Sequence, residues 1–191
     1  PRRVAVIGGG DGGSIREIIK HGSVEKAVLV EIDEQVIEAS RQYLPEISCG
    51  LDDDRVEVLI ADGIAHIRES KNTYDVIIID STDPVGPAVG LFTEEFYRDV
   101  YEALTDQGIM VAQTESPYYE PELVQRTFAR INAGFPTTRL YIAYIPSYPS
   151  GMWSFTLGSK QCDPLSIDDG KLQALKTRYY TPDVHRAAFC L

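Results

Sequence analysis

The sequence of 191 residues has few cysteines and no long apolar run. Its three cysteines, Cys49, Cys162 and Cys190, are odd in number and form neither a Cys-x-x-Cys pair nor a zinc-binding spacing. We therefore expect reduced thiols, which are typical of a cytoplasmic protein. No apolar run approaches the ~18 residues of a membrane helix, and no signal peptide is visible. These absences predict a cytoplasmic location and no membrane partner.

Positive charge is also scarce. Lys and Arg number 18 against 29 Asp and Glu, which gives a formal net charge of −11. This balance argues against nucleic acid and anionic membrane surfaces as partners, because both are bound by basic surface. It suits cationic small molecules, although acidic enzymes with other substrates are common.

Several conspicuous side chains are expected to be structural only. Tyr118 and Tyr119 are expected to pack, and Trp153, which opens a strand, is expected to lie in the core. The three histidines have no metal-ligand spacing. We expect no metal site and helix-end or surface roles for His21, His66 and His185.

Apolar runs alternate with amphipathic segments along most of the chain. The expected strands are Val4–Ile7, Ala27–Val30, Val56–Ile60, Val76–Ile79, Gly108–Ala112, Thr138–Tyr144 and Trp153–Leu157. The expected helices are 14–20, 34–43 with Asp33 as N-cap, 64–69, 93–104 and 121–133. Repeated strand–helix units predict a mostly parallel sheet with helices on both faces, and the last two strands predict a closing antiparallel hairpin.

This pattern predicts one α/β domain over residues 1–191. A mostly parallel sheet with a C-terminal antiparallel hairpin resembles the Rossmann-like fold of adenosylmethionine-dependent methyltransferases. The dinucleotide-binding fold is the near alternative, and the closing hairpin counts against it.

A glycine-rich loop with one acid follows the first strand. A loop between a strand and a helix is the context that nucleotide binding requires, although a tight strand–helix turn would also need glycine. Asp11 lies inside this loop, where a carboxylate would repel a pyrophosphate but attract an ammonium or sulfonium group. The loop therefore favours an adenosylmethionine-type ligand over NAD. Its glycines are Gly8, Gly9, Gly10, Gly12 and Gly13.

Two further acids follow the next two strands. Glu31 ends the second strand, where an acid can accept both ribose hydroxyls; otherwise it is an exposed acid beside the cap of the next helix. Asp62 and Gly63 follow the third strand. A side-chain acceptor there suits the exocyclic amine of adenine, but Asp-Gly is equally a common turn.

Asp80 and Asp83 follow the buried strand Val76–Ile79, at the sheet edge where ligands of open α/β folds bind. A protonated primary amine has a pKa near 10 and cannot attack carbon until it loses a proton. Asp80 is placed to orient the amine and take that proton, and Asp83 to anchor a second ammonium of a diamine. The alternative is a cap and turn role for both acids.

These motifs together resemble the spermidine synthase family of polyamine aminopropyltransferases, bacterial type. The resemblance is collinear and spans nearly the whole chain. The matching segments are Gly8–Glu17, Val30–Asp33, Ala61–Gly63, Asp80–Ala88, Gln113–Pro117 and Tyr148–Trp153.

The resemblance implies transfer of the aminopropyl group of decarboxylated S-adenosylmethionine to putrescine, which yields spermidine and methylthioadenosine. It implies no cofactor and no metal, because the donor is a co-substrate whose sulfonium supplies the leaving group. The residues then expected to bind the donor are Asp11 (amine), Glu31 (ribose), Asp62 and Gly63 (adenine amine), and Pro87, Ala88 and Leu91 (packing around adenine).

On the acceptor side, the resemblance implies that Asp80 is the catalytic base. Asp83 is expected to hold the acceptor's far amine with help from Gln113 and Tyr148. Putrescine is the expected acceptor, and cadaverine, agmatine and spermidine remain open. A methyltransferase that uses intact adenosylmethionine and a non-catalytic polyamine-binding domain are the alternative functions.

The family also has a β-rich domain before the glycine loop and usually continues past the position of Leu191. We expect both parts to be absent from this chain. In relatives the missing part supplies much of the dimer contact, so a homodimer or homotetramer is expected for the full-length protein.

Overall fold

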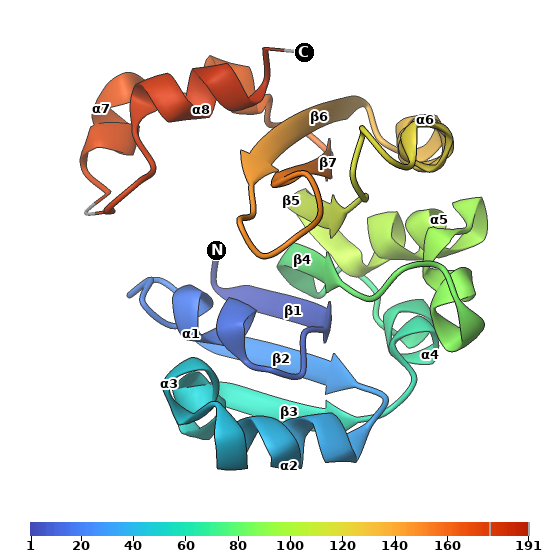
Figure 1. Cartoon of the computed structure of the whole chain (residues 1–191), viewed down its shortest axis with the longest axis vertical. Helices are drawn as coiled ribbons and strands as arrows, with labels where there is room; N and C mark the ends of the chain where they lie inside the picture. The colour runs from blue at the N-terminus through green and yellow to red at the C-terminus, as the bar shows by residue number, and fades with distance from the viewer. Residues whose placement is uncertain (176, 191) are drawn as a thin grey trace.

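The structure is a computed structural model that describes residues 1–175 and 177–190. A seven-stranded sheet runs through the molecule in the order β3-β2-β1-β4-β5-β7-β6 (Figure 1). The strands are β1 (Arg3–Gly8), β2 (Lys26–Glu31), β3 (Val56–Ile60), β4 (Tyr74–Asp80), β5 (Leu104–Gln113), β6 (Thr137–Tyr144) and β7 (Met152–Ser159). The first five are parallel, and β7 lies antiparallel to both β5 and β6. The predicted mixed sheet with a closing hairpin is confirmed.

Helices cover both faces of the sheet, as predicted. Figure 1 shows α4, α5 and α6 together on one side, with α1, α7 and α8 on the other. The α-helices are α1 (Gly13–Ile18), α2 (Glu34–Tyr43), α3 (Pro45–Ser48), α4 (Gly63–Glu69), α5 (Glu94–Ala103), α6 (Pro121–Gly134), α7 (Asp169–Gln173) and α8 (Pro182–Ala188). Three short 3-10 turns complete the described elements: η1 (Cys49–Asp52), η2 (Gly86–Phe92) and η3 (Pro164–Ser166).

The central strands are apolar on both faces because each face packs against helices. In β1, Ala5 and Ile7 join the core beneath α4, α5 and α6. Val4 and Val6 join the second core cluster, which includes α1 and α2 residues. An uninterrupted apolar run is therefore what the sheet requires at this position.

Strand order reverses at β1, which lies between β2 and β4. In open α/β sheets, ligands bind at such a switch point, outside the carboxyl ends of the strands. The register pairs Gly8 at the end of β1 with Asp80 at the end of β4. The glycine loop and the predicted base therefore start from adjacent points of the sheet edge.

The predicted start of β5 is wrong. The helix ends at Ala103, near the expected end, but β5 begins at Leu104, four residues before the expected strand. The pairing of β4 with β5 shifts register between Tyr74 and Val76. The polar residues 105–107 lie within this irregularity, so they need not fit the regular alternation of a strand. Thr105 supports it by donating a hydrogen bond to Asp75.

The C-terminal segment holds two short helices, α7 and α8, that were not predicted. His185 lies in the last turn of α8, as one of its two expected roles requires, but it is buried, with hydrogen bonds to the Tyr180 hydroxyl and the Pro164 carbonyl, so a surface role is wrong for this histidine. Tyr118 and Tyr119 contact each other edge to face but are 71% and 57% exposed, so their predicted packing role is also wrong. Within the described residues, no helix combines the length and apolarity needed to cross a membrane.

Candidate active site

A cleft of about 1180 Å³ runs along the carboxyl ends of the parallel strands. The glycine loop, the loop after β4 and the β6–β7 hairpin contribute to its walls. Every residue predicted to bind donor or acceptor lines it, together with Gly8, Gly9 and Gly10. Gly12 and Gly13 do not line it, so the predicted glycine loop faces the cleft only in its first half.

The glycine loop passes very close to Asp80. Gly8 and Gly9 have φ angles of +80° and +67°, which side-chain-bearing residues rarely adopt. A Cβ on Gly9 would lie 2.7 Å from Asp80 Oδ2. Gly13 has another role, because its N–H donates a 2.8 Å hydrogen bond to Asp11 Oδ1 and fixes that carboxylate.

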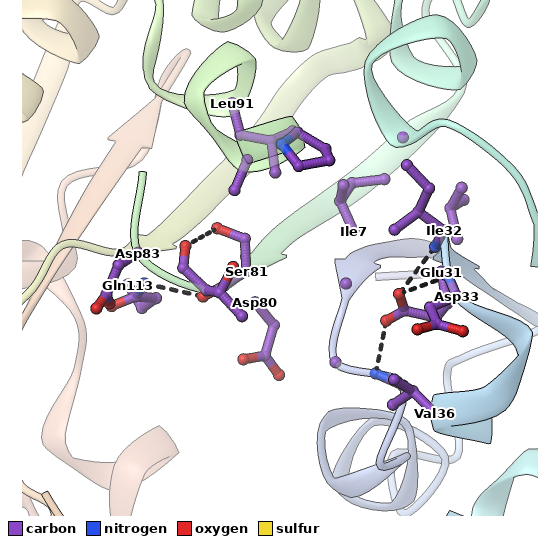
Figure 2. Close-up of a pocket in the computed structure, with 18 of the residues that line it drawn as sticks. Ile7, Glu31, Ile32, Asp33, Val36, Asp80, Ser81, Asp83, Leu91 and Gln113 are labelled. Carbon is purple, nitrogen blue, oxygen red and sulfur yellow. Dashed lines mark hydrogen bonds between the residues drawn. The ribbon is translucent and has the colours of Figure 1, made fainter. Parts of the chain in front are cut away.

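Glu31 connects the end of β2 to the glycine loop. It is buried, and its Oε2 accepts a 3.2 Å hydrogen bond from the Gly10 N–H. Oε1 accepts from the backbone N–H groups of Ile32 and Asp33 at 2.8 and 3.1 Å (Figure 2). These bonds hold the carboxylate at the cleft wall. Oε2 has a further lone pair, so it can also accept from a diol.

Asp62 has the turn role that the sequence left open, and it also faces the cleft. It is the N-cap of α4, where Oδ1 accepts a 2.8 Å hydrogen bond from the Ile64 N–H, and it also lines the cleft. The next residue, Gly63, has no room for a side chain, because a Cβ there would lie 2.4 Å from the Ile7 side chain. The turn chemistry therefore places an acceptor at the cleft wall.

Asp80 ends β4 between the two halves of the cleft. In Figure 2 its carboxylate lies between Glu31 on one side and Asp83 with Gln113 on the other. Ser14 Oγ donates a 2.7 Å hydrogen bond to Asp80 Oδ2. Sequence reasoning missed Ser14, because only the pairing of β1 with β4 brings it to Asp80.

Gln113 connects the loop after β4 to strand β7. Its amide nitrogen donates to the Ser81 carbonyl at 2.9 Å, and its oxygen accepts from Trp153 Nε1 at 2.9 Å. Trp153 is 9% exposed and stacks at an angle against Tyr148, with ring centroids 4.4 Å apart. The predicted core position of Trp153 is confirmed, but it is also part of the cleft wall. Burial, and then the Asp80 and Asp11 carboxylates, raise the pKa of Tyr148.

The cleft carries strong negative charge. Among the residues lining it there are six acids and no Lys, Arg or His. Such a cleft attracts cations, because converging charges of one sign focus the field. In the part of the chain that the structure describes, no group of His, Cys, Asp or Glu is arranged to hold a metal ion. The acids are Asp11, Glu31, Asp33, Asp62, Asp80 and Asp83.

The chain is similar to known proteins over its whole length. It is 62% identical over 191 residues to a polyamine aminopropyltransferase of Caldicellulosiruptor saccharolyticus, covering all of this chain and 69% of that protein. A crystal structure of spermidine synthase in complex with the transition state analogue AdoDATO superposes with a TM-score of 0.97 at 49% identity, covering 100% of this chain and 67% of that one.

The spermidine synthase from Thermotoga maritima superposes with a TM-score of 0.92 at 47% identity, covering 100% of this chain and 65% of that one. The chain thus spans about two thirds of the length of these relatives. The family described as the spermine/spermidine synthase domain matches residues 1–168. With this match and these identities, the chain belongs to the spermine/spermidine synthase family.

Proposed function

We propose that the chain is the catalytic domain of a spermidine synthase. It transfers the aminopropyl group of decarboxylated S-adenosylmethionine to putrescine and releases spermidine and methylthioadenosine. The observation that carries this proposal is the row of acids along one cleft, with Asp80 between its two halves. Both substrates are cations, and the cleft offers them carboxylates with no competing basic side chain among the lining residues.

The donor occupies the half formed by the ends of β1, β2 and β3. Glu31 accepts the ribose hydroxyls, and Asp62 with Gly63 receives the adenine amine. Asp11 holds the ammonium of the aminopropyl group. Adenine is covered by the apolar wall of η2, formed by Pro87, Ala88 and Leu91.

The acceptor occupies the half formed by Asp83, Gln113 and Tyr148. Asp80 takes a proton from the near ammonium, and the freed nitrogen lone pair attacks the donor's aminopropyl carbon. The carbon–sulfur bond breaks with its electron pair on sulfur, so the cationic sulfonium becomes a neutral thioether. The proton passes from Asp80 to solvent. Catalysis then consists of orientation, deprotonation and stabilisation of charge, and the donor is a co-substrate, so no cofactor is required.

The position of Asp11 favours the decarboxylated donor over intact adenosylmethionine. Its carboxylate is fixed at the cleft by the Gly13 N–H, and it would repel the carboxylate of the intact donor. Calorimetry with both donors tests this choice. Tighter binding of the decarboxylated donor is expected, and much tighter binding of the intact donor would favour a methyltransferase.

The decisive experiment supplies the full-length protein with the decarboxylated donor and separate amines, and identifies the products by mass. Spermidine formed from putrescine is the expected product. Faster turnover of cadaverine, agmatine or spermidine would change the acceptor, and no aminopropylated product with any amine would refute the function. A cytoplasmic homodimer or homotetramer belongs to this proposal, and light scattering on the full-length protein measures the assembly.

Ser14 is expected to position Asp80, because its hydroxyl donates to the base at 2.7 Å. A hydrogen bond to a charged group contributes about 1.5–3 kcal/mol, so Ser14→Ala should lower kcat by about tenfold. The KM of the donor should stay unchanged. Ser14→Thr, which keeps the hydroxyl, should recover most of the rate, and Ser23→Ala at an exposed position serves as control. Equal kcat values for wild type and Ser14→Ala would contradict the role.

A further inference from the structure

Glu115 is a buried acid behind the acceptor side of the cleft, and none of the roles above uses it. It lies two residues beyond the end of β5 and is 6% exposed. Its φ of +77° is strained for a residue with a side chain. Ser154 holds this backbone in place, because its N–H and its hydroxyl both donate to the Glu115 carbonyl at 2.9 and 2.8 Å.

The carboxyl group of Glu115 has too few donors to be held as an anion. Oε2 accepts one 3.2 Å hydrogen bond, from the Ser116 N–H. Oε1 is fully buried and accepts no hydrogen bond from any described residue. An ionised carboxylate normally accepts several hydrogen bonds, so a buried oxygen without a donor favours the protonated form.

Two acids near Glu115 add to this effect, Asp83 from the loop after β4 and Glu120 from the turn before α6. Tyr148 from the β6–β7 hairpin lies near as well, and burial and then nearby carboxylates, Glu115 among them, raise the pKa of its hydroxyl. None of them is positively charged. Burial raises the pKa of Glu115 to about 7, together with the nearby Asp83 carboxyl group, which can share a hydrogen bond with Glu115 only when one of the two is protonated, and with the Asp83 and Glu120 charges.

We propose that Glu115 holds a proton against Asp83 while the acceptor site is empty, and releases it when the far ammonium of the acceptor binds. This inference rests on the proposed function. The ammonium pairs with Asp83, which lines the cleft, and its positive charge replaces that of the shared proton. Glu115–COOH loses its proton to solvent, and the ammonium beside Asp83 compensates the charge of the carboxylate that remains.

Two consequences distinguish this exchange from simple charge attraction. Acceptor binding must release a proton at pH values where Glu115 is protonated in the empty site. Acceptor affinity must also rise with pH until Glu115 is ionised throughout, because below its pKa the proton competes with the ammonium. A monoamine such as butylamine has no far ammonium and should cause no such release.

Calorimetry on the full-length protein saturated with methylthioadenosine measures the released protons. Putrescine is titrated at pH 7 in buffers of different ionisation enthalpy, with Glu115→Gln as the test variant. Because the pKa is about 7, the wild type should release about half a proton more than the variant. Butylamine in place of putrescine and Glu122→Gln, an exposed acid on α6, serve as controls.

Kinetics give a second readout. The KM of putrescine should fall about tenfold between pH 6 and pH 8 in the wild type, relative to Glu115→Gln. If the variant does not fold, Asp83→Asn replaces it, since loss of the Asp83 charge should move the midpoint of the KM profile to lower pH. An unmoved midpoint in that variant would refute the exchange.

The outcomes separate this inference from the proposed function. Wild type and Glu115→Gln that make spermidine, release equal numbers of protons and share one KM profile would refute only the proton exchange. A wild type that binds no putrescine and makes no spermidine would refute the function and the exchange together.

Discussion

Asp80→Asn is expected to lower kcat by about three orders of magnitude while the donor still binds. Asparagine has nearly the same shape and can still accept the Ser14 hydrogen bond that holds Asp80 in place. It cannot take a proton from the acceptor's ammonium, and it removes the negative charge that orients this group. The donor's ribose and adenine contacts lie at Glu31 and Asp62, away from the change.

Single-turnover kinetics and calorimetry with methylthioadenosine measure the two effects on the full-length protein. Asp54→Asn, at an exposed position in the turn before β3, is the matched control and should behave as wild type. An Asp80→Asn variant with full activity would remove the base from the mechanism and revive a non-catalytic, polyamine-binding role.

Gly8→Ala is expected to lower the free energy of unfolding by about 3 kcal/mol, the largest stability effect predicted for the site. The left-handed conformation costs an alanine about 1–2 kcal/mol. A Cβ at Gly8, where φ is +80°, would lie 2.3 Å from the Asp80 carbonyl oxygen, so the backbone must also shift. Overpacking of this kind adds about 1–3 kcal/mol.

Thermal unfolding measures this loss, and Tm should fall by about 10 °C. Gly22→Ala is the matched control, because a Cβ at that exposed glycine meets no atom within 4 Å. Since the shift displaces Asp80, kcat should fall as well. A Tm within about 2 °C of wild type would show that the β1–β4 junction accommodates a side chain.

The sequence was sufficient for the sheet and most of the cleft. Buried parallel strands are apolar on both faces, so β1, β2 and β4 appear as runs that no surface strand would show. Because the carboxyl ends of parallel strands meet at one edge, acids placed just after those runs had to share a cleft. The start of α2 was also predictable from local sequence, because Asp33 caps this helix by accepting a hydrogen bond from the Gln35 N–H.

The errors arise where local pattern carries little information. Periodicity needs several turns, and α3, α7 and α8, of four to seven residues, are too short to show it. The equally short α1 and α4 were predicted because each directly follows a strand and its loop in the strand–helix alternation. The start of β5 at Leu104 depends on its irregular pairing with Tyr74, a partner 30 residues earlier in the chain. His185 is polar by type, but a hydroxyl and a carbonyl satisfy its ring nitrogens inside the fold.

The amino-acid sequence alone therefore predicted the seven strands, the helices α1, α2, α4, α5 and α6, and the gathering of acids beside a glycine loop. The tertiary structure alone determined which groups lie next to those acids. Ser14 meets Asp80, and Glu115 faces Asp83, across 66 and 32 positions of sequence. The reason is physical: secondary structure depends on near neighbours and periodic burial, whereas hydrogen bonds and charge interactions act between groups that only strand pairing brings together.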